Sequence, residues 1–183
     1  GECTMSTLIT STAQIGTIKD AGGNQNAISI DSSGRTTFPQ KIAFKAGLAS
    51  NFNPGTASRT KVPFVLGGLT GRHFNHGGGF DASNGWFAAP IAGTYWFAAQ
   101  TYLASHSASD YHILRFSGND NTFIYGEGND LSVPNSGSYD SKVITMIADL
   151  AAGDKVDVRT QSASDGSYVL ETGNTAFMGY LIG

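Results

Sequence analysis

The chain has 183 residues, a net charge of −3 and one cysteine, Cys3, which excludes an intrachain disulfide framework and a cysteine-rich zinc site. Charged residues make up only 14% of the chain and no basic cluster occurs, which argues against a nucleic-acid or anionic-membrane partner. With 24 glycines and no run of about 18 apolar residues, the composition favours short strands and tight turns over helices or a membrane span.

The first part of the chain carries few large apolar side chains. Residues 1–4 are interpreted as vector-derived residues ahead of a native Met5, although truncation of a longer chain would leave the same letters. Residues 5–39 are predicted to form an extended attachment segment, in which "AISID" is a short strand and "AGGNQN" and "SSGR" are turns. Such pieces cannot bury a core, so we expect them to be ordered only by pairing with other chains or by packing on the next domain.

Residues 40–183 are predicted to form one all-β domain of nine or ten short strands, a β-sandwich of jelly-roll type. Turn signals such as "SNFNPGT", "ASNG" and "AAGDK" recur roughly every ten residues, and short apolar runs such as "KVPFVL" and "YHILRF" lie between them. No segment keeps a helical period. "SKVITMIADL" is long enough for a helix, but its β-branched residues and the turn that follows favour a strand.

Several predicted strands are apolar on both faces, whereas a strand of a sandwich normally has one apolar face toward the core and one polar face toward water. In residues 93–103, Tyr95 and Phe97 lie on one face and Trp96 on the other. Both alternating sets near residue 145 are apolar as well. A symmetric oligomer is the simplest cover for the second face, and a long loop of the same subunit is the alternative. The predicted interface residues are Trp96, Tyr102, Met178 and Tyr180.

Three stretches of residues 40–183 resemble one family, the globular head of complement component 1q and the wider tumour-necrosis-factor-like jelly rolls. "LAAGDKVDVRTQ" is similar to a late hairpin of that family, and "NTAFMGYLIG", with Phe177, is similar to its closing strand. The chain departs from the pattern at Leu69 and Ala99, where the family has aromatic residues. The resemblance implies a tight trimer of ten-stranded jelly rolls. The third stretch carries the spaced aromatic signature of the family, at Asn75, Phe80, Phe87, Gly93, Tyr95 and Phe97.

The segment "AISIDSSGRTTFPQKIAFKAG", residues 27–47, resembles a stretch found in bacteriophage tail fibres and related virion proteins. There it leads into a C-terminal head of this kind. The Gly-X-Y repeat of a collagen stalk does not occur in the sequence. The resemblance therefore implies an extracellular virion fibre protein, attached to other virion proteins through residues 5–39.

The leading functional hypothesis is a non-catalytic trimeric head that binds a host-surface glycan or protein. The alternatives are a structural virion decoration or fibre-tip trimerisation protein, and a secreted lectin-like or signalling ligand of the same fold. Loops at one end of a sandwich commonly carry binding, and their aromatic and amide side chains suit sugars. The predicted receptor contacts are Asn119, Asp120, Asn121, Tyr125, Glu127, Asn129, Asp130 and Asn135.

Catalytic and metal chemistry is considered and disfavoured, and no cofactor is expected. Ser105, His106 and Asp110 are too close in one turn to form a nucleophile–base–acid line, and no nucleophile elbow occurs. Glu127 and Asp130 could act as a glycosidase pair, but the sequence around them shows no sign of a cleft. Hydrolysis of a host polysaccharide is therefore disfavoured as well. The remaining metal candidates are turn residues whose side chains also suit ordinary turns: His73 and His76 for a transition metal, Asp120 and Asp130 for calcium.

Overall fold

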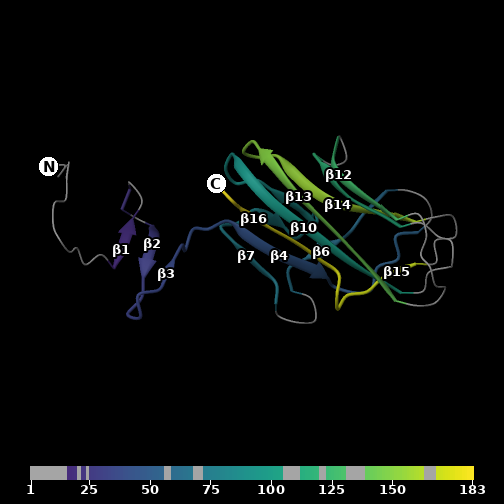
Figure 1. Ribbon diagram of the computed structural model, residues 1–183, viewed down its shortest axis with the longest axis horizontal. Helices are drawn as coiled ribbons and strands as arrows, with labels where there is room; N and C mark the ends of the chain where they lie inside the picture. Colours follow the sequence, from purple (N-terminus) through teal and green to yellow (C-terminus); the bar gives the residue numbers. More distant parts are fainter. Residues whose placement is uncertain are drawn as a thin grey trace. The chain divides into compact units, whose positions relative to one another are not determined.

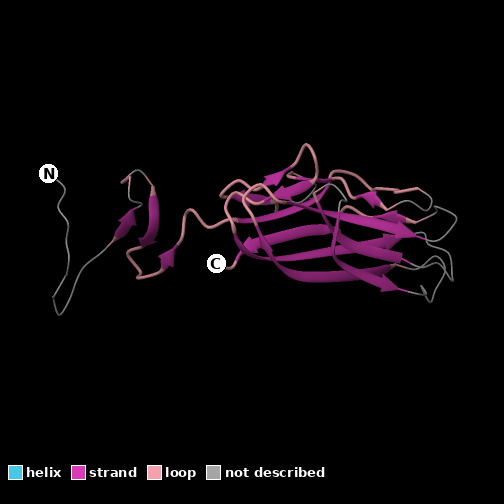
Figure 2. Cartoon of the chain, turned by 90° about the horizontal axis from the view of Figure 1, so that it is seen from above, coloured by secondary structure: helices cyan, strands magenta, loops and turns pink. Residues whose placement is uncertain are grey.

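The structure is a computed structural model, and it describes residues 16–19, 22–23, 25–55, 59–67, 72–104, 112–119, 123–130, 139–162 and 168–183. The chain divides into two compact units, Gly1–Gln40 and Lys41–Gly183, which are described separately (Figure 1). The described parts consist of strands and loops (Figure 2). They contain no helix that is long and apolar enough to cross a membrane.

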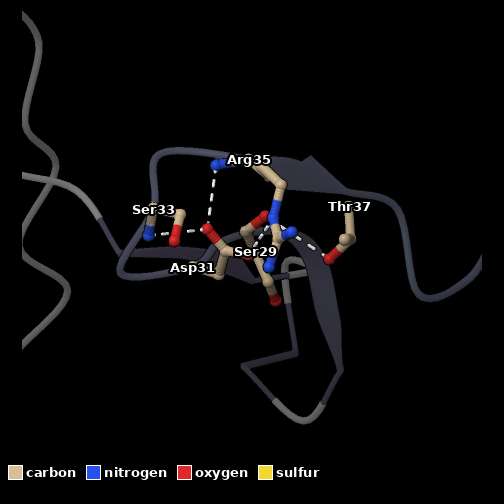
Figure 3. Close-up of polar contacts among 5 residues, drawn as sticks. All are labelled: Ser29, Asp31, Ser33, Arg35 and Thr37. Carbon is tan, nitrogen blue, oxygen red and sulfur yellow. Dashed lines mark hydrogen bonds and ion pairs between the residues drawn. The ribbon is translucent and has the colours of Figure 1, made fainter.

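The first unit contains a small antiparallel sheet of β1 (Thr17–Lys19), β2 (Asn26–Ile30) and β3 (Thr36–Thr37). The predicted strand "AISID" and the predicted turn "SSGR" are both confirmed. Asp31 organises that turn, because its Oδ1 accepts hydrogen bonds from the backbone N–H groups of Ser33 and Arg35, both at 2.9 Å (Figure 3). Arg35 donates its Nε–H to Oδ2 of Asp31 at 2.7 Å. These contacts lower the pKa of Asp31, the backbone bond from Arg35 most of all.

The second unit contains two antiparallel sheets, here called the first and the second sheet. The first sheet has the order β13-β10-β16-β4-β6, with β15 beside β10 and β7 beside β4. Its strands are β13 (Asp140–Leu150), β10 (Gly93–Ala104), β16 (Ala176–Leu181), β15 (Val169–Leu170), β4 (Ala43–Leu48), β6 (Phe64–Val65) and β7 (Phe74–His76).

The second sheet has the order β12-β11-β14-β9-β8, with β5 beside β14. Its strands are β12 (Phe123–Asp130), β11 (His112–Gly118), β14 (Lys155–Ser162), β9 (Trp86–Ala88), β8 (Phe80–Asp81) and β5 (Thr60–Lys61).

Three strand positions are interrupted, which explains why more than ten strands are seen. β15 and β16 pair with successive parts of β10, β6 and β7 share one edge of β4, and β5 and β9 share one edge of β14. Among the described residues, each sheet therefore has five strand positions. The predicted all-β, ten-stranded jelly-roll sandwich is confirmed, and "SKVITMIADL" is a strand.

Aromatic rings fill the space between the two sheets. Phe44 stacks on Phe80 and Phe87 at 5.1 Å each and meets the edge of Phe177 at 4.8 Å. All four side chains are buried, together with Tyr95 and Phe97 from β10. Gly179 leaves room for this packing, because a Cβ there would lie 2.5 Å from Phe97 and 2.9 Å from Phe44. The spaced aromatics of the sequence are thus the core of the sandwich.

Polar signature residues hold the ends of strands. The side-chain amide of Asn75 donates to the carbonyl of Phe80 at 2.9 Å and accepts from its N–H at 3.2 Å, which closes the turn between β7 and β8. The hydroxyl of Tyr95 donates to the carbonyl of Ile91 at 2.8 Å, and burial raises the pKa of this tyrosine. On β9, the Trp86 ring has the ammonium groups of Lys61 and Lys155 over it, at 4.5 and 4.1 Å from its centroid.

Candidate functional site

The outward side of the first sheet carries several large apolar side chains, with polar residues such as Gln100 and Thr145 between them. Antiparallel pairing sets Trp96 of β10 directly opposite Ile147 of β13 and opposite Tyr180 of β16, so all three project from the same face. The rings of Trp96 and Tyr180 lie 5.3 Å apart. The aliphatic side chains next to them are well exposed in the single chain, with Val143 at 59% and Ile147 at 67%.

β13 carries apolar side chains on both of its faces, the face toward the core and the face that points outward. Ile144 and Met146 are partly buried and pack against the core, whereas Val143 and Ile147 alternate with them and point outward. In a sheet face intended for water, those outward positions would be polar. β13 thus carries two exposed aliphatic side chains on its outward face.

Aromatic pairs extend the same face toward both of its sides. Tyr139 stacks on Tyr102 with ring centroids 5.2 Å apart and planes 9° apart, and Tyr139 is 63% exposed. On the edge strand β7, Phe74 stacks on His76 at 4.9 Å. We call the following set the outer apolar face: Trp96, Tyr102, Tyr139, Val143, Ile147, Met178 and Tyr180.

All four predicted interface residues belong to the outer apolar face: Trp96, Tyr102, Met178 and Tyr180. The two most exposed aliphatic residues, Val143 and Ile147, were not assigned to it from the sequence. Their signal is the apolar alternation on both sides of residue 145. Only the register with β10 shows which of the two sets points away from the core.

A second feature of this side is a polar hollow of about 190 Å³, bordered by Lys45, the turn at residues 172–175 and Gln100. Arg72 and His73 also line it, and none of the described residues that line it is a carboxylate. The imidazole of His73 packs on Gly47, where a Cβ would overlap the ring. Partial burial, and to a lesser degree the charge of Lys45, lower the pKa of His73. The hollow therefore suits a small anionic or hydroxyl-rich group.

The predicted receptor contacts fall into three structural settings. Asn119 lies in a turn at φ 44°, and its Oδ1 accepts the backbone N–H of Lys155 at 3.0 Å. The expectation that Glu127, Asn129 and Asp130 lie in a loop is wrong, because these residues belong to β12, which pairs with β11. Ladder pairing with β11 outweighs the turn preference of the glycines there. Tyr125, Glu127, Asn129 and Asp130 therefore lie on a strand, whereas Asp120, Asn121 and Asn135 fall outside the described residues.

The metal and catalytic candidates are not brought together where the structure describes them. His73 packs near Gly47, while His76 lies opposite Ala43, at the other end of β4. Ser105, His106 and Asp110 lie outside the described residues, as do the calcium candidate Asp120 and the signature position Leu69. Across the described parts of the chain, no group of three or more histidine, cysteine, aspartate or glutamate side chains is arranged to hold a metal ion.

Comparison with known proteins adds one match. A family model described as the C1q domain matches residues 43–182, which is most of the second unit. No curated protein matches the chain.

Proposed function

Because the chain belongs to the C1q-domain family, we propose that it is the trimeric, non-catalytic head of a bacteriophage fibre protein that binds a receptor on the host-cell surface. C1q domains typically form trimers and bind ligands, and the family is generally non-catalytic and extracellular. The single observation that carries the proposal is the outer apolar face, which a lone chain leaves exposed to water.

The energetics of this face support a stable trimer. Fully burying an aliphatic or aromatic side chain of this size contributes roughly 1.5–3 kcal/mol, so an interface that buries four or five of them would hold the subunits together strongly. In a ring with threefold symmetry, each subunit contributes two different patches to its neighbours. We propose that Val143 and Ile147 on the edge strand β13 form one patch, and that Trp96, Met178 and Tyr180 form the other.

The proposed receptor contacts remain Asn119, Asp120, Asn121, Asn135 and four positions of β12. β12 is an edge strand of the second sheet, which does not carry the outer apolar face, and it lies beside β13, the edge strand of the first sheet. Trimerisation through the outward face of the first sheet would leave the second sheet accessible to a receptor. Tyr125 is proposed to stack on a sugar ring, and Asn129 to hydrogen-bond its hydroxyl groups.

The virion setting rests on residues 27–47, which resemble a segment of tail fibres. A separate N-terminal unit ahead of the head suits attachment to another virion protein. In the structural alternative, the head only trimerises and aligns the fibre. In the secreted alternative, the same trimer is a lectin-like or signalling ligand.

Adsorption of the fluorescently labelled chain to intact candidate host cells tests the proposal, with sedimentation run in parallel. The proposal expects a trimer that saturates the cells, and binding that is lost in a double Tyr125→Ala, Asn129→Ala variant that stays trimeric. A matched control is Ala152→Glu, an exposed turn position at the end of β13. A chelator arm tests whether calcium contributes. A trimer that adsorbs to no host favours the structural alternative, and a monomer overturns the proposal.

A further inference from the structure

The small sheet of the first unit has one apolar face. Pairing sets Ile18 of β1 opposite Ile28 of β2, and Ile30 of β2 opposite Thr36 of β3, so these residues share a face. Phe38 follows two residues after Thr36. Three of these side chains are exposed in the single chain: Ile18 at 47%, Ile30 at 41% and Phe38 at 57%. We call Ile18, Ile28, Ile30 and Phe38 the isoleucine face.

The other face of the sheet is polar. Thr17, Ser29 and Thr37 lie opposite one another across its three strands. The hydroxyl of Thr37 donates to the carbonyl of Ser29 at 3.4 Å, and the Asp31–Arg35 ion pair closes the adjoining turn (Figure 3). The sheet is thus sharply two-sided, with a face that suits water and a face that does not.

Within this unit, no described residue covers the isoleucine face. The strands have only three, five and two residues, and a sheet of that size has too little core to be stable by itself. Its order therefore depends on an apolar partner of matching size.

We propose that the isoleucine faces of three copies of this chain pack against one another around a threefold axis. This inference rests on the trimeric head of the proposed function. Because Gln40 is bonded directly to the first residue of the head unit, a trimeric head holds three of these sheets within a short tether of each other. Such tethering raises the effective concentration of each sheet at its two neighbours to the millimolar range. Three identical faces can also pack as a closed ring. A copy of the same face also matches it in size, and the charged side chain of Lys19, opposite Asn26, lies exposed at the margin of that face.

Cysteine cross-linking of the full chain tests this packing. Cys3 is the single cysteine of the chain, so a Cys3→Ser background leaves only the introduced thiol. Ile18→Cys and Ile30→Cys place a thiol on the isoleucine face, and Thr17→Cys is the matched control, one residue away on the polar face. Each variant is treated with a short bismaleimide and analysed by denaturing electrophoresis, and its sedimentation is measured before treatment.

The packing predicts at least tenfold more cross-linked dimer for Ile18→Cys and Ile30→Cys than for Thr17→Cys, all from trimeric protein. Equal yields from trimeric protein would overturn the packing and leave the trimeric head standing. Monomeric protein would overturn both. Hydrogen exchange of residues 26–30 is a second measurement that does not need a thiol. Protection in the parent chain must fall by at least tenfold in Ile30→Asp and stay unchanged in Thr17→Asp, and protection that persists in Ile30→Asp contradicts the packing.

Discussion

Trp96 of β10 and Ile147 of β13 lie directly opposite each other and project from the same outward face of the first sheet. Trp96 is also directly opposite Tyr180 of β16 on the same face. The pair lies where the edge strand β13 meets β10 of the first sheet.

Ile147→Glu is expected to convert the trimer into a folded monomer. The side chain is 67% exposed in the single chain, so a carboxylate there costs the isolated fold little. In a closed trimer, three unpaired carboxylates would be buried, which is strongly unfavourable. Sedimentation velocity measures the change, with Ala152→Glu as a charge-matched control. A variant that still sediments as a trimer with unchanged affinity would remove Ile147 from the interface.

Gly179→Ala is expected to lower the free energy of unfolding by about 1–3 kcal/mol, because the added methyl overpacks the core. A Cβ at this position would lie 2.5 Å from Phe97 and 2.9 Å from Phe44, and both rings are held by other aromatics. Urea denaturation at one fixed protein concentration measures the change. Gly173→Ala is the control, since nothing lies within 4 Å of its Cβ, and equal unfolding midpoints for the two variants would contradict the packing argument.

Acidification is expected to destabilise the fold through His73. Burial lowers its pKa below the ordinary 6.5, and its Nδ1 accepts the backbone N–H of Gly67 at 3.3 Å, which requires the neutral ring. The unfolded chain takes up the proton first, so this contribution is complete above pH 6.5 and is lost as the pH falls from 6.5 through the lowered pKa of the folded protein. Urea midpoints above and below that pH, in the parent and in His73→Asn, measure it. Parallel losses in both proteins would mean that His73 contributes nothing.

At the alkaline end, Tyr168 is expected to destabilise the fold. Burial raises the pKa of its phenol to about 12 from the ordinary 10.0, while the bond to the Thr160 hydroxyl at 3.2 Å opposes this rise. The unfolded chain ionises first, so stability falls as the pH rises above 10.0. Tyr168→Phe is expected to lose less stability over the same range, as measured by urea denaturation. Phenolate absorbance that develops fully in the native parent near pH 10 would contradict the shift.

Sequence patterns predicted the sandwich well, because its core alternates strictly along β10 and its turns are marked by glycine and asparagine. They could not assign the faces of β13, since alternation of equally apolar residues gives no direction. That direction comes from the pairing of Trp96 with Ile147, a contact between distant segments. The contact of His73 with Gly47 is likewise set by the fold and has no local signal. In β12, pairing with β11 overrides a glycine-rich composition that ordinarily marks turns.

The two tryptophans of the chain stand in contrasting surroundings, and this makes assembly optically visible. Trp86 carries the ammonium groups of Lys61 and Lys155 against its ring within one subunit, so its emission should be indifferent to whether neighbours are present. Trp96 belongs to the surface that neighbours would conceal. A shift of intrinsic fluorescence on dilution would therefore come from one indole and report subunit dissociation without any label.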